Sequence, residues 1–148
     1  EDGPVSVSMH IRRGDYAKHP QLQVCTPAYY QAAFEFLKSK FEDFCVFVFS
    51  DDIPYCKEIL AGNENVIYVE NCGTDLDEFQ LMSCCKHHVV ANSTFSWWSA
   101  WLGEMRNQDG RMVLTPPVWY NEPEKYPQQM RHIDVTKIIP DHWTKIYF

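Results

Sequence analysis

Two arginines and an aspartate follow an apolar segment near the start of the chain, and their side chains suit anion binding. Arg12, Arg13 and Asp15 come after Val5–Met9, where apolar and small polar residues alternate as in a short, mostly buried strand. A guanidinium carries five N–H donors in a planar fork that fits phosphate oxygens. Gly14 allows a sharp turn or a close approach of the backbone to a ligand. The stretch predicts an anion site, or alternatively two surface charges and a turn aspartate.

Two further polar segments follow apolar runs of strand length. Ser50–Asp52 comes after Cys45–Phe49, and Asn92–Ser96 comes after His87–Ala91. The carboxyl ends of parallel strands meet at one edge of a sheet, and in open α/β sheets ligands bind in the crevice outside that edge. We therefore expect both segments to lie beside His10–Tyr16 and to form one site with it.

The third polar segment carries three hydroxyl groups at the point where a helix is expected to begin. Free backbone N–H groups and the positive end of a helix dipole bind anions, whereas Ser and Thr are also ordinary helix caps. Because Arg12 and Arg13 are expected across the crevice, we favour phosphate binding over capping alone. The sequence contains neither a Walker lysine loop nor a GxGxxG fingerprint. The three hydroxyl groups belong to Ser93, Thr94 and Ser96.

The adjacent carboxylates Asp51 and Asp52 suit more than one task. One of them can accept hydrogen bonds from a guanine N1–H and exocyclic amine, or from ribose hydroxyls. Alternatively, the pair can hold a metal ion that bridges phosphates. A third reading is a cap for the following helix. Because two arginines are available to balance phosphate charge, the site does not require a metal.

Two other motifs carry less weight. Cys84–His88 contains two cysteines and two histidines, but adjacent side chains at a helix-to-strand junction point apart, which disfavours zinc. Asn92-Ser93-Thr94 matches the N-glycosylation sequon, yet Asn92 is expected to leave a buried strand rather than lie in an exposed loop. The six cysteines do not form a compact disulfide framework, so we expect most of them to be reduced core residues.

Strand-like and helix-like segments alternate along the chain. Thr26 followed by Pro27 marks a helix start, and this helix is expected to reach about Phe41. Thr74 marks another helix, whose early carboxylates suit the helix dipole. The alternation predicts an α/β fold: one Rossmann-like, three-layer domain with a mostly parallel sheet. The further expected elements are a short helix ending at Leu60, strands at Val66–Val69 and Arg111–Thr115, a helix at Trp97–Leu102, and a short helix or turn within Ile133–Ile139.

The composition limits the class of protein. The 148 residues are 45% hydrophobic and 15% aromatic, which is typical of a globular chain with one core. A net charge of −7 argues against broad nucleic-acid binding, so an anion site must be a local basic pocket. No run of 18 apolar residues predicts a membrane span, and no signal peptide is apparent. The chain begins at Glu1 shortly before a strand, so we expect it to be a piece of a longer protein.

Three motifs stand in order along the chain. They are His10-Ile11-Arg12-Arg13-Gly14-Asp15-Tyr16, Phe49-Ser50-Asp51-Asp52, and Asn92-Ser93-Thr94-Phe95-Ser96-Trp97-Trp98-Ser99-Ala100-Trp101-Leu102. Together they resemble glycosyltransferase family 11, the α1,2-fucosyltransferases, and the resemblance extends from near Val5 to about Trp119. It implies an inverting enzyme that transfers L-fucose from GDP-β-L-fucose to the 2-hydroxyl of a terminal galactose, without a metal or other cofactor.

The resemblance also implies roles for individual residues. Arg12 or Arg13 would hold the donor pyrophosphate and stabilise the departing GDP. Asp15 is the candidate for the catalytic base, with a structural role as the alternative. The other residues assigned to donor binding are His10, Gly14, Tyr16, Asp51, Asp52, Asn92, Ser93, Thr94, Ser96 and Trp97.

The family's GT-B architecture has two Rossmann-like domains with the active site between them. Residues 1–148 correspond to the C-terminal, donor-binding domain alone, so we expect the acceptor-binding half to be absent and the chain to be inactive by itself. The expected partners are GDP-fucose and a galactoside-terminated glycan, with no nucleic acid. We expect a bacterial cytoplasmic location, or the Golgi lumen for a eukaryotic source, and the full-length protein has scope for peripheral membrane association.

Two other functions remain open on the sequence alone. The chain can be a GDP-sugar-binding module without transferase activity. Arg13-Gly14-Asp15 is also the RGD tripeptide of adhesion ligands, although a strand end inside a crevice presents it poorly.

Overall fold

A six-stranded parallel sheet forms the centre of the chain. The computed structural model describes residues 3–106, 109–121 and 135–148. Within them every pair of neighbouring strands is parallel, and the strand order is β3-β2-β1-β4-β5-β6. The strands are β1 (Val5–Ile11), β2 (Phe44–Ser50), β3 (Val66–Tyr68), β4 (His87–Val89), β5 (Val113–Thr115) and β6 (Thr144–Lys145).

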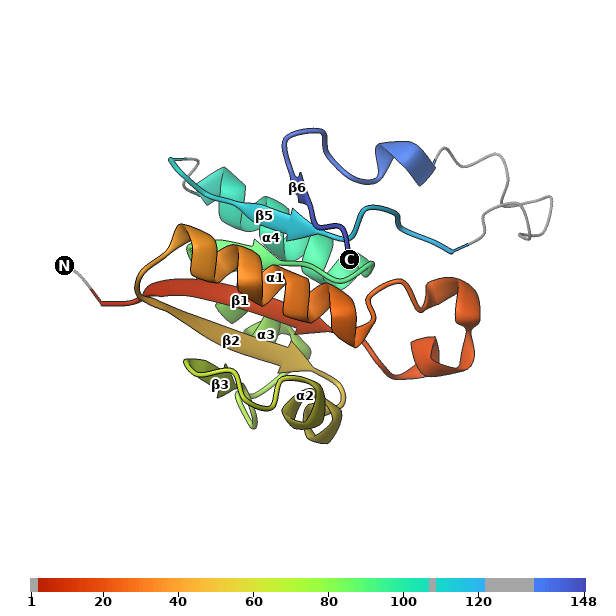
Figure 1. Ribbon diagram of the computed structural model, residues 1–148, viewed down its shortest axis with the longest axis horizontal. Coiled ribbons are helices and arrows are strands. Elements are labelled where there is room, and N and C mark those ends of the chain that lie inside the picture. Colours follow the sequence, from red (N-terminus) through yellow and green to blue (C-terminus); the bar gives the residue numbers. More distant parts are fainter. Residues whose placement is uncertain (1–2, 107–108, 122–134) are drawn as a thin grey trace.

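Helices cover both faces of this sheet. Helix α1 lies over one face, and α3 and α4 lie over the other (Figure 1). The α/β, Rossmann-like, three-layer prediction is therefore confirmed. The helices are α1 (Pro27–Lys40), α2 (Ile53–Ile59), α3 (Asp75–Cys84) and α4 (Thr94–Arg106), with short 3₁₀ turns η1 (Asp15–Lys18), η2 (Pro20–Leu22) and η5 (Val135–Lys137).

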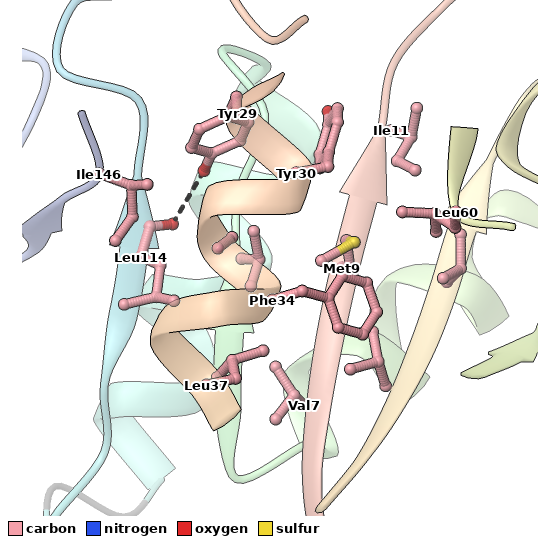
Figure 2. Packing of buried hydrophobic residues seen from close by; sticks show 14 of the residues in the cluster. Val7, Met9, Ile11, Tyr29, Tyr30, Phe34, Leu37, Leu60, Leu114 and Ile146 are labelled. Atoms are coloured by element: carbon pink, nitrogen blue, oxygen red, sulfur yellow. Dashed lines mark hydrogen bonds between the residues drawn. The ribbon is translucent and has the colours of Figure 1, made fainter. Parts of the chain in front are cut away.

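The main core lies between α1 and the sheet. Figure 2 shows Phe34 of α1 beside Met9 of β1, and Leu37 of α1 beside Val7. Two buried tyrosines add hydrogen bonds, because their hydroxyls need partners once they are removed from water. Tyr29 donates to the Val90 carbonyl at 2.6 Å, and Tyr30 donates to the His10 carbonyl at 3.0 Å. Helix α1 thereby fixes the carboxyl ends of β1 and β4 relative to each other.

The strand order reverses direction between β1 and β4. From β1 the chain proceeds to β2 and β3 on one side, and then crosses to β4, β5 and β6 on the other. Such a reversal separates the loops that leave the two central strands, and it is where open α/β sheets bind ligands. The loops after Ile11 and Val89 border this point. They carry the first and third polar motifs, as the sequence predicts.

Two elements differ from the sequence prediction. Helix α4 begins at Thr94, three residues before the predicted start at Trp97, so Thr94 and Ser96 belong to its first turn. Strand β6 was not predicted; it pairs with β5, and the Ile146 amide donates to the Thr115 carbonyl at 2.9 Å. Of the predicted turn within residues 133–139, the first two residues lie outside the described part, and η5 occupies Val135–Lys137.

All six cysteines are free, as expected, but the prediction that most of them are core residues is wrong, because only Cys56 and Cys85 are buried. Among the described residues, no helix has the length and apolar character needed to cross a membrane.

Candidate functional site

A cavity of about 400 Å³ opens at the carboxyl ends of β1 and β4. Residues from all three predicted polar motifs line it, so the expected convergence at one sheet edge is confirmed. The predicted site residues that line it are His10, Arg12, Tyr16, Asp51, Ser93 and Thr94. Ser50 and Phe95, which belong to the predicted segments but were given no individual role, also line it, and Asp75 and Glu78 were not predicted.

His10 near the end of β1 and Arg12 just beyond its last residue both line this cavity at the carboxyl edge of the sheet. The His10 ring is 6% exposed, and its centroid lies 5.4 Å from that of Phe95. Burial, assisted by the Arg12 charge and opposed by Asp51, lowers the pKa of His10 to about 4. Its Nδ1 has no hydrogen-bond partner among the described residues. A buried, neutral imidazole with an unsatisfied nitrogen in a cavity favours a polar ligand.

The Arg12 guanidinium is held in place at the cavity wall. Its Nη2 lies 2.9 Å from an Asp15 oxygen, and its Nη1 lies 3.4 Å from an Asp51 oxygen. The same group lies 5.4 Å from the centre of the Tyr16 ring. The Arg12 side chain is 36% exposed, so it keeps donors for an anion. Asp15 does not line the cavity, and its carboxylate is engaged by Arg12.

Arg13 lies on the other side of the loop. Its guanidinium packs over the Tyr55 ring at 3.8 Å, and its Nε lies 3.7 Å from an Asp52 oxygen. Its backbone amide donates to Asp51 at 2.9 Å. Arg13 lines a separate, smaller hollow of about 110 Å³ that Arg12 and Tyr16 also border. Arg12 therefore borders both spaces, whereas Arg13 borders only the smaller one.

The loop after β2 supports the loop after β1. Asp52 caps α2 by accepting a hydrogen bond from the Tyr55 amide at 3.1 Å, which was one of its predicted alternatives. The Ser50 hydroxyl donates to the Ile11 carbonyl at 2.6 Å. A methyl group on Gly14 would overlap the Asp51 carboxylate. The absent side chain of Gly14 thus allows Asp51 to reach both arginines.

The turn between β4 and α4 places a helix N-terminus beside Arg12. Ser93 and Thr94 line the cavity there, where backbone N–H groups and the helix dipole favour an anion. Ser96 is fully buried, and its hydroxyl accepts the Ala91 amide at 3.2 Å. Its contacts hold the turn together, and it does not line the cavity.

Asn92 and Trp97 hold neighbouring segments in place. The Asn92 amide donates to the Leu22 and Trp119 carbonyls at 2.9 and 3.0 Å, and the residue is 2% exposed. This burial agrees with the argument against glycosylation. Trp97 donates to the Ile138 carbonyl at 2.8 Å, and neither Asn92 nor Trp97 lines the cavity.

Asp75 and Glu78 stand in the first turn of α3 and face the cavity. From the sequence, these early carboxylates were expected only to complement the helix dipole. Burial raises the pKa of Glu78, against the effect of its hydrogen bond with Cys72. The topology of the sheet could have identified these two carboxylates as site residues. Helix α3 begins after β3, at the same carboxyl edge as the other polar motifs. In the described part of the chain, no group of three or more metal-ligating side chains is arranged to hold an ion.

Residues 3–135 match the sequence profile of glycosyl transferase family 11. This match covers most of the chain and includes every residue named in the cavity. The chain belongs to glycosyl transferase family 11. The predicted resemblance is therefore confirmed.

Named relatives in this family span two activities. An Escherichia coli protein named Alpha-1,2-colitosyltransferase is 40% identical over 127 residues, which is 80% of this chain and 42% of the relative. The Escherichia coli O-antigen biosynthesis glycosyltransferase WbnK is 34% identical, over 78% of this chain and 39% of the relative. The Mus musculus Galactoside alpha-(1,2)-fucosyltransferase 1 is 30% identical, over 65% of this chain and 27% of the relative. The chain thus spans less than half the length of these relatives.

Proposed function

We propose that this family 11 chain is the donor-binding part of an inverting glycosyltransferase that moves L-fucose from GDP-L-fucose to the 2-hydroxyl of a terminal galactose. The single observation that carries the proposal is the cavity where Arg12, His10 and the N-terminus of α4 meet. Those groups offer a cation, an unsatisfied nitrogen and free amides to one ligand, which fits a nucleoside diphosphate.

Arg12 and the start of α4 would bind the pyrophosphate. When the bond to the sugar breaks, negative charge develops on the β-phosphate, and prearranged donors stabilise it most strongly at that moment. Arg12 is fixed by Asp15 and Asp51, so the guanidinium needs little reorganisation during the step. Asp15 then has a positioning role, and we place the base that deprotonates the acceptor hydroxyl in the acceptor-binding part of the enzyme.

The guanosine end of the donor needs hydrogen-bond acceptors. Asp51 is occupied by the Arg13 amide and by Arg12. Asp75 and Glu78 line the same cavity, and as carboxylates they can accept hydrogen bonds from guanine N–H groups or ribose hydroxyls. We therefore propose that guanosine lies toward the start of α3 and that the sugar lies nearer Arg12.

The greater length of the relatives supports the view that donor binding and acceptor binding lie in different parts of the protein. The aligned part of the Escherichia coli colitosyltransferase is 42% of that protein. We propose that this chain contributes the donor half of a GT-B enzyme and that acceptor contacts come from another part of the protein. Transfer would then be a property of the whole enzyme, while donor binding would be measurable on this chain.

Colitosyl transfer is a second candidate, favoured by the 40% identity to a colitosyltransferase. Colitose lacks one hydroxyl that fucose carries. A site built to hydrogen-bond that hydroxyl rejects the analogue without it, because the protein's polar groups are left unpaired. The two donors therefore distinguish the two candidates.

A thermal-shift titration tests donor binding. At a GDP concentration 100 times the dissociation constant, binding stabilises a protein by about 2.7 kcal/mol. For a chain of this size the melting temperature should then rise by about 5–10 °C. ADP at the same concentration is the matched control and should give a smaller rise. An unchanged melting temperature with GDP would contradict the proposal.

A transfer assay tests the chemistry. The whole enzyme is incubated with lactose and either GDP-fucose or GDP-colitose, and the products are identified by mass spectrometry. Fucosylated lactose as the main product supports the proposal, and a preference for GDP-colitose supports the second candidate. Donor binding without any transfer would identify a GDP-sugar-binding module.

A further inference from the structure

A second hollow, of about 380 Å³, lies beside helix α4 and away from the donor cavity. Trp101, Glu104 and Met105 of α4 line it, together with Arg111 before β5 and His142 before β6. Its volume lies within the range of small-molecule sites. Met105 stands eleven residues beyond the start of α4, a separation of about 16 Å along a helix. A ligand in this hollow would not occupy the donor cavity.

The aromatic wall of the hollow is open to solvent. Trp101 is 37% exposed, and Met105 is 58% exposed. Trp98, which is 52% exposed, extends the surface, with its ring centroid 5.5 Å from that of Trp101 and the planes 79° apart. Sugar rings present an apolar C–H face that packs on an exposed indole, while hydroxyl groups remain at their edges. Those hydroxyl groups need hydrogen-bond partners next to the indole.

The polar wall supplies such partners in fixed positions. One Glu104 oxygen lies 3.0 Å from His142 Nε2, and the other accepts the Trp143 indole N–H at 3.1 Å. Each carboxylate oxygen keeps a further lone pair for a hydroxyl. Arg111 donates to the Cys85 carbonyl and borders the same hollow. The side chains around the hollow are thus anchored by contacts within the protein, which reduces the entropy cost of binding.

The charges around the hollow point to an uncharged ligand. Among the described residues that line it, there is one carboxylate, Glu104, and one guanidinium, Arg111, and their formal charges balance. An anion gains little from such a site, and membrane-surface sites typically surround exposed tryptophans with several lysines or arginines. Exposed indoles, anchored polar groups and balanced charge together suit a neutral polyhydroxyl compound. We propose that this hollow binds a neutral glycan chain, at a site separate from the donor cavity.

NMR of the indole N–H groups tests this proposal, because the chain has five tryptophans in different environments. The probe is lacto-N-neotetraose, an uncharged, galactose-terminated tetrasaccharide. Titration should shift the Trp98 and Trp101 signals in a saturable way. The signal of the buried Trp119 should remain unchanged. Added GDP should not reverse the shifts, so this test remains informative even if GDP fails to bind.

Substitutions locate the site. Trp101→Ala should weaken tetrasaccharide binding by about tenfold, because the stacking surface is lost, and Trp101→Phe should recover part of the affinity. Ile67→Ala, which truncates an apolar residue exposed on β3, is the control and should bind as the parent chain does. Absence of saturable shifts, displacement of the sugar by GDP, or unchanged affinity in Trp101→Ala would overturn the proposal. Changes in the Trp98 and Trp101 signals with protein concentration alone would also overturn it, since a second copy of the chain would then cover the surface.

Discussion

The two sides of the loop after β1 differ, although the arginines on them are neighbours in the sequence. On one side, Arg12 and His10 face a cavity of about 400 Å³. On the other, Arg13 packs over Tyr55 beside a hollow of about 110 Å³. Both arginines follow the last residue of β1, yet their contacts differ: Arg12 pairs with Asp15 and Asp51, and Arg13 packs over Tyr55. We infer that Arg12 contacts the donor and that Arg13 positions the loop through Tyr55 and Asp52.

The largest expected effect separates the two arginines. Arg12→Ala should reduce GDP affinity on the order of 100-fold or more, because it removes a prearranged charged donor from the cavity. Isothermal titration calorimetry measures this loss. Arg12→Lys is the conservative variant and should restore only part of the affinity, since a single ammonium cannot form the guanidinium's paired hydrogen bonds.

Arg13→Ala is the matched control for that loss. It should lower GDP affinity less than about tenfold, while the loss of packing over Tyr55 destabilises the fold by about 1 kcal/mol. The melting temperature without ligand should fall by a few degrees. Equal losses of GDP affinity in the two variants would show that the arginines share the ligand.

The pH dependence of stability tests whether His10, which lines the same cavity as Arg12, is buried. The pKa of His10 falls from 6.5 to about 4 on folding, so between these pH values the unfolded chain binds more protons than the folded chain. The free energy of unfolding therefore keeps its full value above pH 6.5 and decreases as the pH falls toward 4. At pH 5 the cost is about 2 kcal/mol. His87 and His88, whose pKa values burial lowers to about 4 and about 3, act in the same direction.

Denaturant unfolding at pH 7 and pH 5 measures this dependence. His10→Gln should reduce the loss of stability between these values by about 2 kcal/mol. The exposed His19, on the loop between η1 and η2, provides the control variant His19→Gln, which should leave the dependence unchanged. If His10→Gln left it unchanged as well, His10 would not be buried and neutral in solution.

Gly14→Ala should disturb both sides of the loop by a smaller amount. The added methyl group overlaps the Asp51 carboxylate, which contacts Arg12 and the Arg13 amide. Crowding of this kind costs about 1–3 kcal/mol, and calorimetry should also show weaker GDP binding. Gly3→Ala, at a position with open space around it and no left-handed φ, controls for the general cost of replacing a glycine. A Gly14→Ala chain as stable as the parent would mean that Asp51 moves freely.

The smallest expected effect is that of a chelator. We propose that Arg12 and the start of α4 bind the pyrophosphate without a metal ion, so EDTA should leave the GDP-induced rise in melting temperature unchanged. Loss of the rise, with recovery on addition of Mg²⁺, would instead assign a metal to the carboxylates that line the cavity.

The sequence predicted the features that depend on pattern. Five strands, the parallel sheet and the meeting of three polar motifs follow from the alternation of apolar runs with helix signals, and the structure confirms them. Strand β6 was missed because two residues, Thr144 and Lys145, carry too little alternation to predict a strand. Its pairing depends on the position of β5, which is a property of the tertiary fold.

The sequence predicted which segments meet at the site. Which of their side chains line the cavity depends on packing. Helical spacing predicts Leu76, Phe79 and Met82 or Ser83 as the buried face of α3. The prediction is wrong for Leu76, which is 64% exposed, and is confirmed for Met82 and Ser83, which are buried. Asp75 and Glu78 were assigned to the helix dipole because their distance from the other motifs in sequence hides their place at the cavity. The different surroundings of Arg12 and Arg13 were not predictable either, because both lie in the loop after β1, where strand periodicity no longer fixes side-chain direction.

A crystal structure of the chain with GDP tests the central claim most directly. The account predicts the β-phosphate in the cavity, about 2.7–2.9 Å from the Arg12 guanidinium nitrogens and beside the backbone amides at the start of α4. Arg13 should remain over Tyr55 in that complex. A β-phosphate bound by Arg13, or GDP bound outside the cavity, would contradict the account.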